Sequence, residues 1–291
     1  MRVVVSGASG FIGTSVVRQL RMAGHQVIAI VAAGSFAGSG TNPGDDPSVI
    51  EDPRSTVLLS DAIQRVGAEA AIHLAGRLDP LPDAHEFDAV IEANIGFASR
   101  FVGAVGRANP GCRVVVVRSI REFATTRPDV ESLYAASKLA FQPVLRYLAR
   151  SYDLDIVSVV LPWVYGPGQR DSALIPTLAR SAVTGQVAGI SSPHTEIDLV
   201  YVEDAATAVA QCLEPSLAIG EWRVTAGTAI SIGEIADRVA AIAGSKVAAD
   251  WGATESRSVD LVPADLPAVL PGWHPRTELD VGLEDVIASV S

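Results

Sequence analysis

Residues 2–13, which read RVVVSGASGFIG, decide the fold of this chain. The apolar run at the start predicts a buried strand over residues 2–5, and the pattern after it predicts a helix over residues 11–23. Glycines stand at positions 7, 10 and 13, between the strand and the first turn of the helix. They let backbone amides approach a phosphate closely, and the helix amino terminus adds a partial positive charge. The stretch therefore predicts a dinucleotide-binding loop made of Gly7, Ser9, Gly10, Phe11, Ile12 and Gly13.

The rest of the first half continues the alternation of buried strands and helices. Strands are predicted over residues 27–31, 49–50, 70–74, 113–117 and 156–161, and helices over residues 55–66, 86–107 and 134–151. Strands separated by helices of this length form βαβ units, whose strands are parallel and whose crossovers are right-handed. The fold class is therefore α/β, a doubly wound parallel Rossmann sheet covered by helices on both faces.

The pattern changes after Pro162, where proline and glycine recur and the helices shorten. We expect a dinucleotide-binding Rossmann domain over residues 1–162 and a smaller, C-terminal substrate-binding lobe over residues 163–291. Some segments, at about residues 198–225, are expected to return to the first domain. Isolated strands are predicted over residues 199–202 and 222–225, and amphipathic helices over residues 231–243 and 279–288. Such a lobe would lie at the carboxyl ends of the strands, where these sheets bind ligands.

Composition narrows the class of protein. The chain has 291 residues and a formal net charge of −11. Because 48% of the residues are hydrophobic and only 19% are charged, a disordered chain is excluded. No basic cluster is present to neutralise phosphates, so we expect no nucleic-acid partner. No apolar run is long enough to span a bilayer and no signal peptide is recognisable, so we expect a cytoplasmic protein without a membrane partner. Cys112 and Cys212 lack any metal-ligand spacing, and we predict two buried thiols and no metal site.

Tyr134 and Lys138, in the sequence Tyr-Ala-Ala-Ser-Lys, lie four residues apart and hence on one face of a helix. A free phenol has a pKa of about 10, and a nearby lysine ammonium is expected to lower it. Tyr134 could then exchange a proton with a carbinol oxygen while a nicotinamide carries the hydride. Ser119, at the carboxyl end of the strand over residues 113–117, is predicted to hold the same oxygen. We therefore predict Ser119, Tyr134 and Lys138 as catalytic residues.

The form of the dinucleotide stays open. An acidic residue that binds the adenosine ribose, or an arginine that binds a 2′-phosphate, commonly follows the second strand. The sequence there is Ile30-Val31-Ala32-Ala33, and neither residue type is present. Ser35 could hydrogen-bond to either group, so the predicted cofactor is NAD or NADP.

Taken together, these motifs resemble those of the extended short-chain dehydrogenase/reductase family, the NAD-dependent epimerases, dehydratases and reductases that act mainly on nucleotide sugars. The resemblance extends over nearly the whole chain and includes the glycine loop and the Tyr134/Lys138 pair. It also includes segments that read His73-Leu74-Ala75-Gly76, Asn94-Ile95-Gly96, Leu161-Pro162-Trp163-Val164-Tyr165-Gly166-Pro167-Gly168 and Asp198-Leu199-Val200-Tyr201-Val202-Glu203-Asp204, and the carboxyl-terminal Gly272-Trp273-His274-Pro275-Arg276-Thr277. It implies further cofactor contacts from Asp52 at the adenine, and from Leu74, Ala75, Gly76, Asn94, Pro162 and Val164.

Two departures from the family pattern bear on the reaction and the substrate. Ser119 is followed by Ile120-Arg121 instead of the acid/base pair of the 4,6-dehydratases, which disfavours elimination of water. Ile197 occupies the place of an arginine that often binds the diphosphate of a nucleotide sugar. Arg170, His194 and Arg257 are candidates to replace that arginine, and the predicted substrate-binding set is Arg77, Arg121, Trp163, Arg170 and His194.

The favoured function is an NAD(P)-dependent ketoreductase that acts on a nucleotide-activated 4-keto-6-deoxy sugar. A nucleotide-sugar 4-epimerase with tightly bound NAD and a reductase of a non-nucleotide ketone remain alternatives, and a cofactor-binding regulatory protein without turnover is disfavoured by Tyr134 and Lys138. The family also implies a homodimer built on the helices over residues 86–107 and 134–151. Their apolar rows, Val90/Phe97/Phe101/Val105 and Phe141/Leu145/Leu148, could equally face the sheet.

Overall fold

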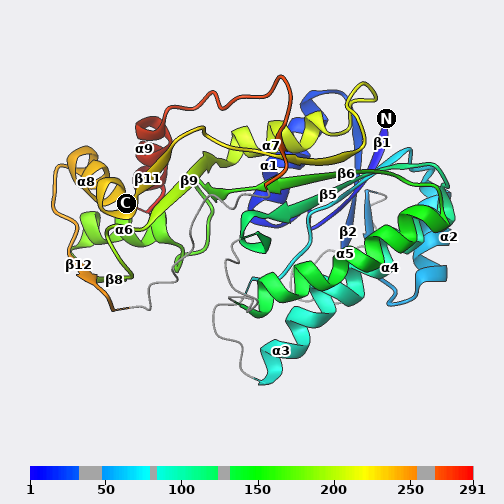
Figure 1. Cartoon of the computed structure of the whole chain (residues 1–291), viewed down its shortest axis with the longest axis horizontal. Coiled ribbons are helices and arrows are strands. Elements are labelled where there is room, and N and C mark those ends of the chain that lie inside the picture. The colour runs from blue at the N-terminus through cyan, green and yellow to red at the C-terminus, as the bar shows by residue number, and fades with distance from the viewer. Residues whose placement is uncertain (33–47, 79–83, 124–131, 254–265, 291) are drawn as a thin grey trace.

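A large parallel sheet forms the centre of the computed structural model, which describes residues 1–32, 48–78, 84–123, 132–253 and 266–290 (Figure 1). Its strand order is β13-β10-β6-β5-β4-β1-β2-β3 and every neighbouring pair is parallel. The strands are β1 (Arg2–Ser6), β2 (Gln26–Val31), β3 (Val49–Glu51), β4 (Ala70–His73), β5 (Arg113–Ser119), β6 (Asp155–Leu161), β10 (Gly220–Arg223) and β13 (Ala268–Val269). The predicted doubly wound parallel sheet is confirmed.

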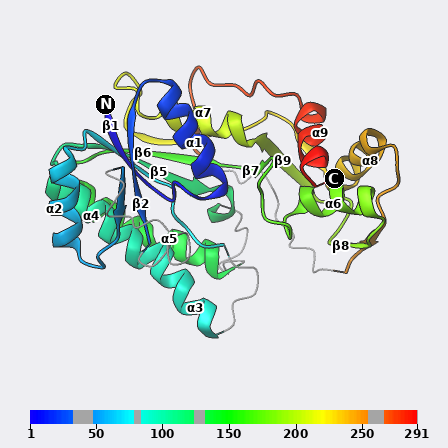
Figure 2. The ribbon, with the colours of Figure 1, turned by 180° about the vertical axis from the view of Figure 1, so that it is seen from behind.

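Helices cover both faces of this sheet. One face carries α1 (Phe11–Met22) and α7 (Val202–Gln211), and the other carries α2 (Thr56–Val66), α4 (Ala98–Ala108) and α5 (Leu133–Ser151) (Figure 2). Alternate residues of one strand enter opposite cores, with Val3 and Val5 on the first face and Val4 on the second. Because both faces are buried, the strands are apolar throughout, which is the pattern from which the parallel sheet was predicted.

The predicted helix over residues 86–107 is divided into three parts. It consists of α3 (Ala84–Ile91), the π-helical segment η2 (Glu92–Phe97) and α4. Single π turns interrupt helices most often at functional sites, and this one contains Asn94. The two apolar rows face the sheet: Phe101 and Val105 of α4, and Phe141 and Leu145 of α5, are buried in the core beneath these helices. Those side chains are therefore unavailable for a dimer contact, and the homodimer stays a prediction.

The remaining elements pack together at one end of the molecule (Figure 1). They are β7 (Trp163–Tyr165), α6 (Leu174–Thr184), β8 (Ala188–Ile190), β9 (Glu196–Tyr201), β11 (Ala229–Ser231), α8 (Ile232–Ala243), β12 (Ala249–Trp251) and α9 (Leu279–Val290). Strand β9 pairs with β7 and β11, and β8 pairs with β12, over a separate hydrophobic core. The strands predicted as isolated are therefore paired, since β9 belongs to this group and β10 joins β6 in the large sheet. The domain boundary at residue 162 stays a prediction.

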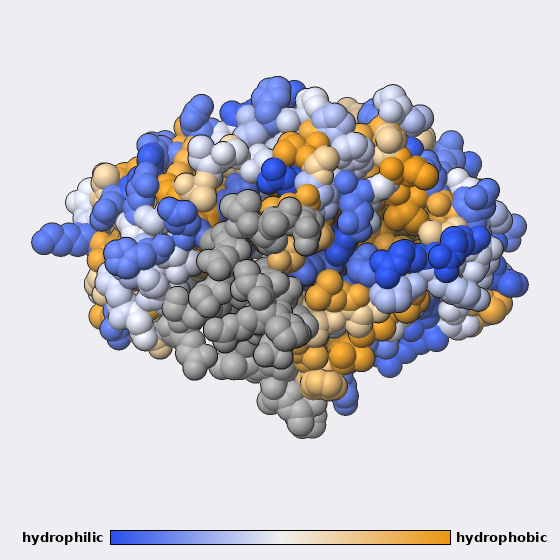
Figure 3. All heavy atoms as spheres, viewed as in Figure 1, coloured by the Kyte–Doolittle hydropathy of each residue, from blue (hydrophilic) through white to orange (hydrophobic). Residues whose placement is uncertain are grey.

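The surface carries both hydrophilic and hydrophobic side chains. On the face drawn in Figure 3, hydrophilic residues border small groups of hydrophobic ones. Within the described ranges, no helix is long and apolar enough to cross a membrane.

Candidate active site

A cavity of about 600 Å³ opens at the carboxyl ends of the central strands. The large sheet and its helices contribute the glycine loop, the end of β5 and one turn of α5, and the smaller group of elements contributes the opposite wall. Most of the predicted site residues line it, namely Gly7, Gly10, Phe11, Ile12, Gly13, Leu74, Gly76, Ser119, Arg121, Tyr134, Lys138, Pro162, Trp163, Val164 and Arg170. Folding thus brings the predicted cofactor loop and the predicted catalytic residues to one cavity.

The other predicted residues lie elsewhere. Ser9, Asp52, Ala75, Arg77, Asn94 and His194 are not among the residues that line the cavity, and Ser35 and Arg257 lie outside the described residues. Arg77 is exposed and forms an ion pair with Glu86. His194 is exposed, although its neighbour Thr195 reaches the cavity. The assignment of Arg77 and His194 to the substrate therefore gains no support from their positions.

The glycine loop fits a dinucleotide phosphate. Gly7 has a φ of +74°, and a Cβ there would lie 2.6 Å from the Ala75 amide nitrogen. A Cβ on Gly13 would overlap the Gly7 carbonyl oxygen. At Gly10 an added Cβ would meet only that oxygen, at 3.3 Å, and would otherwise project into open space. Since α1 has neither a side-chain cap nor an acidic residue in its first turn, its first amides have no internal acceptor and can bind an anion.

Ser119, Tyr134 and Lys138 all line the cavity. Ser119 lies close enough to Tyr134 to lower the pKa of its phenol, and the Arg121 guanidinium carbon lies 5.9 Å from the centre of the Tyr134 ring. Ser132 is the N-cap of α5, and its side chain accepts a hydrogen bond from the Ala135 amide at 3.2 Å, which fixes the turn that carries Tyr134.

The pKa of Tyr134 differs from the sequence-based expectation. Burial raises the pKa of Tyr134 and outweighs the lowering by Ser119 and Arg121, so the phenol does not have the lowered pKa that the sequence predicted. Burial also lowers the pKa of Lys138, and the nearby Glu122 carboxylate opposes that change. A Cβ on Gly76 would lie 3.1 Å from the Lys138 ammonium nitrogen, so the absence of a side chain at Gly76 leaves room for that ammonium.

Asn94 connects two parts of the site from the π-helical segment. Its Oδ1 accepts a hydrogen bond from the Arg77 amide at 2.8 Å, and its Nδ2 donates to the Arg77 carbonyl and the Ser137 hydroxyl. Asn94 therefore joins the loop after β4 to α5, and its contact with a cofactor stays a prediction.

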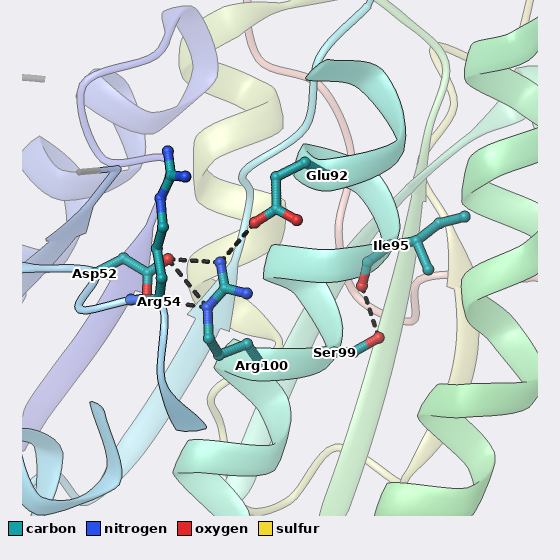
Figure 4. Close-up of polar contacts among 6 residues, drawn as sticks. All are labelled: Asp52, Arg54, Glu92, Ile95, Ser99 and Arg100. Atoms are coloured by element: carbon teal, nitrogen blue, oxygen red, sulfur yellow. Dashed lines mark hydrogen bonds and ion pairs between the residues drawn. The ribbon is translucent and has the colours of Figure 1, made fainter. Parts of the chain in front are cut away.

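Asp52 follows β3, as predicted, but its carboxylate faces the protein (Figure 4). Oδ2 accepts from Nη2 of Arg100 at 2.6 Å, and Oδ1 accepts from Nε of Arg100 at 3.1 Å and from the Arg54 amide at 3.0 Å. Arg100 also pairs with Glu92 at 2.7 Å. Because most of the acceptor capacity of this buried carboxylate is in use, the adenine contact of Asp52 stays a prediction.

Sequence reasoning missed Gln169, which lines the cavity. Its Nε2 donates to the Val164 carbonyl at 3.0 Å, which fixes the orientation of the amide. Its Oε1 is buried and has no hydrogen-bond partner among the described residues. A buried acceptor without a donor is costly, so this oxygen is a candidate contact for a hydroxyl of a ligand. No local motif marks the residue, because only the fold brings Gln169 to the cavity.

Part of the cavity wall is aliphatic, although Ser191 and Thr195 of the smaller group of elements also line the cavity. Ile197 is buried there, and Leu174, Ile175, Leu199 and Ile232 line the cavity beside it. The position at which the family often has an arginine is therefore part of a hydrophobic wall.

His73 is buried in the core next to the site. Its Nδ1 and the Ser6 hydroxyl are hydrogen-bonded at 2.7 Å, and the rings of Phe97, Phe101 and Phe141 surround it. Burial, with a smaller effect of the Lys138 charge, lowers the pKa of His73 to about 3. The imidazole is therefore neutral at physiological pH. Within the described ranges, no group of three or more metal-ligating side chains comes together.

A doubly wound sheet whose first helix opens on an uncapped glycine loop defines a dinucleotide-binding α/β enzyme. The sequence model of the NAD dependent epimerase/dehydratase family matches residues 3–224, and the chain belongs to this family, the extended type of short-chain dehydrogenase/reductase.

Three known proteins illustrate the relationship. The UDP-glucose 4-epimerase of Mycolicibacterium smegmatis is 23% identical and aligns over 99% of this chain and 97% of its own length. The 2-alkyl-3-oxoalkanoate reductase of Stenotrophomonas maltophilia is 27% identical over 72% of this chain and 64% of its own length. The crystal structure of Thermus thermophilus UDP-glucose 4-epimerase in complex with NAD superposes with a TM-score of 0.80, at 23% identity, over 100% of this chain and 99% of that one.

Proposed function

We propose that this enzyme is an NAD(P)-dependent ketoreductase that reduces a carbonyl to a carbinol. The observation that carries the proposal is that Ser119, Tyr134 and buried Lys138 line the same cavity as the glycine loop. Gly7, Gly10, Gly13 and the first amides of α1 would hold the dinucleotide phosphates, and the nicotinamide supplies or accepts the hydride when it is bound.

The protonation state of Tyr134 supports the reductive direction. Because burial raises its pKa, the phenol is protonated at neutral pH and can donate its proton to a carbonyl oxygen as the carbon receives hydride. The Ser119 hydroxyl, which lies near Tyr134, would donate to the same oxygen and polarise the carbonyl. Lys138 would hold positive charge beside the reacting groups and favour the phenolate that remains after proton transfer.

For the substrate we propose a nucleotide-activated 4-keto-6-deoxy sugar. The nearly full-length similarity to a UDP-glucose 4-epimerase supports the nucleotide-sugar part of this proposal. Arg121, Trp163 and Arg170 line the cavity and would bind the sugar or its diphosphate. A specific observation favours a second candidate, a non-nucleotide ketone: the wall around Ile197 is aliphatic, and an oxoalkanoate reductase is among the relatives.

The direct test is a spectrophotometric screen of ketones with both reduced cofactors. The panel contains keto sugars with and without a nucleotide, together with 3-oxoalkanoates. Consumption of NADH or NADPH with formation of the matching carbinol supports the proposal, and the panel member consumed identifies the substrate class. If no ketone in the panel supports oxidation of either cofactor, the proposal is contradicted.

The same protein distinguishes the ketoreductase from a 4-epimerase that uses these residues. An epimerase re-reduces the carbon that it oxidises and retains its cofactor, whereas a ketoreductase exchanges cofactor in each cycle. Release of the ligand from denatured, purified protein measures the difference. Stoichiometric NAD would favour the epimerase, and an empty or NADP-selective site would favour the ketoreductase.

A further inference from the structure

A buried ion pair lies directly behind Ser119. Arg118, the penultimate residue of β5, donates from Nε and Nη2 to Oε2 of Glu122, both at 2.9 Å. The two side chains are 5% and 0% exposed. A third bond joins Nη1 of Arg118 to Glu221 of β10 at 2.5 Å, and the Arg118 guanidinium lies over the Phe123 ring at 4.8 Å. All three guanidinium nitrogens of Arg118 are therefore engaged.

The same carboxylate fixes the backbone of Ser119. Oε1 of Glu122 accepts a hydrogen bond from the Ser119 amide at 2.8 Å, and the Ser119 hydroxyl oxygen accepts one from the Arg121 amide at 3.3 Å. Together these bonds form a capping box on the short helix η3 (Ile120–Glu122). Because a backbone amide donates to the Ser119 hydroxyl oxygen, the hydroxyl proton can be donated to another acceptor in the cavity that Ser119 lines.

Glu122 also acts on its neighbours through its charge. Its carboxylate raises the pKa of Lys138, against burial and the repulsion of Arg118, and it helps to raise the pKa of Tyr134. The charged and titratable groups around it are Arg118, Arg121, Tyr134 and Lys138, with Glu221 beyond Arg118. A buried ion pair is often no more stabilising than apolar residues of the same volume, so stability alone gives little reason for this pair.

We propose that Glu122 is a positioning residue for the reaction: held by Arg118, it fixes the backbone and hydroxyl of Ser119 and supplies the negative charge that faces Lys138 and Tyr134. This inference rests on the proposed ketoreductase function. It assigns no contact with substrate or cofactor to Glu122, which acts through Ser119, Tyr134 and Lys138.

The test compares Glu122→Gln with Glu221→Gln. A glutamine at position 122 has only one acceptor oxygen and can keep only one of the two contacts. Its NH₂ group would then face another donor, either the Arg118 guanidinium or the Ser119 amide. Glu221→Gln removes a charge from the same arginine but does not contact Ser119, which makes it the matched control. Circular dichroism and thermal melting of both variants check that they are folded.

Turnover of the ketone found in the screen provides the first measurement. We expect Glu122→Gln to lower kcat about 10-fold or more and to leave the Kd of the reduced cofactor unchanged. This loss is a part of what a preorganised hydrogen-bond donor, here the Ser119 hydroxyl, contributes to the rate. Glu221→Gln is expected to stay within about twofold of wild type. In a Ser119→Ala background, Glu122→Gln should lower kcat by less than it does in wild type, because part of its effect passes through the Ser119 hydroxyl. A full additional 10-fold loss in that background, or equal losses in the two glutamine variants, would overturn the proposal.

The second measurement needs no turnover. Ultraviolet difference titration, with Tyr134→Phe subtracted, follows the ionisation of Tyr134 alone. Removal of the Glu122 charge should shift this titration to lower pH, and Glu221→Gln should shift it less. An unshifted titration in Glu122→Gln would contradict the role of its charge. If wild type reduces no ketone, the proposed function fails, whereas the titration still tests Glu122.

Discussion

Two replacements in the glycine loop test its role in cofactor binding separately from its role in packing. Gly10→Ala is expected to weaken cofactor binding, and Gly13→Ala is expected to destabilise the fold. At Gly10 the added Cβ lies 3.3 Å from the Gly7 carbonyl oxygen and projects into the cavity. Gly10 has an ordinary φ of −76°, so we expect Gly10→Ala to change the free energy of unfolding by about 1 kcal/mol or less. A methyl group at the surface that should hold the phosphates forces them outward, which we expect to cost about 1–3 kcal/mol of binding, or roughly 5- to 150-fold in Kd.

At Gly13 the added Cβ overlaps the backbone oxygen of Gly7, which no side-chain rotation can relieve. We therefore expect Gly13→Ala to lose about 3 kcal/mol of stability, a decrease in Tm of roughly 6 °C or more.

The assay is a fluorescence titration with NADH and NADPH, together with thermal melting, of wild type and both variants. Gly10→Ala should melt like wild type and bind the cofactor weakly. An unchanged Kd in folded Gly10→Ala would refute the assignment of the loop to phosphate binding, and a native-like Tm for Gly13→Ala would refute the packing argument.

Two further predictions concern the buried histidine and the missed glutamine. His73 has a folded pKa of about 3 and an ordinary pKa of about 6.5, so unfolding binds a proton between these pH values. The contribution of neutral His73 to stability is complete above pH 6.5 and is lost as the pH falls toward 3, by at most about 1.4 kcal/mol per pH unit. As the pH is lowered from 6.5, the urea midpoint of His73→Gln should therefore decrease less steeply than that of wild type. Parallel curves of urea midpoint against pH would contradict the prediction. Gln169→Leu should raise KM for the screened ketone about fivefold to tenfold, the value of one hydrogen bond, with Tm nearly unchanged, and an unaltered KM would show that Oε1 does not contact substrate.

The sequence predicted those features of the site that depend on local spacing. The strand, glycine loop and helix over residues 2–22 follow one another in the chain, and the interval between Tyr134 and Lys138 places both on one face of α5. Ser119 was found because it follows a strand that is almost entirely valine. These features need only the period of a helix or a strand and a turn that requires glycine.

The features that the sequence did not reveal depend on contacts between distant segments. Arg118 reaches Glu221, which is 103 residues away, and Arg100 reaches Asp52 at a separation of 48 residues. Neither pair has a local signature, because charged residues look alike in a sequence whether they are solvated or paired in the interior. For the same reason, the sequence does not reveal that the Glu122 carboxylate is bonded to Arg118 and to the Ser119 amide.

The central claim is that Tyr134 donates the proton in a reduction that uses a bound nicotinamide. The most direct measurement compares wild type with Tyr134→Phe in the rate of reduced-nicotinamide oxidation by the ketone found in the screen. We expect phenylalanine to lower kcat by about 100-fold or more, the usual contribution of a general acid, with the Kd of the cofactor within about twofold of wild type. A variant that binds cofactor normally and turns over at nearly the wild-type rate would contradict the claim.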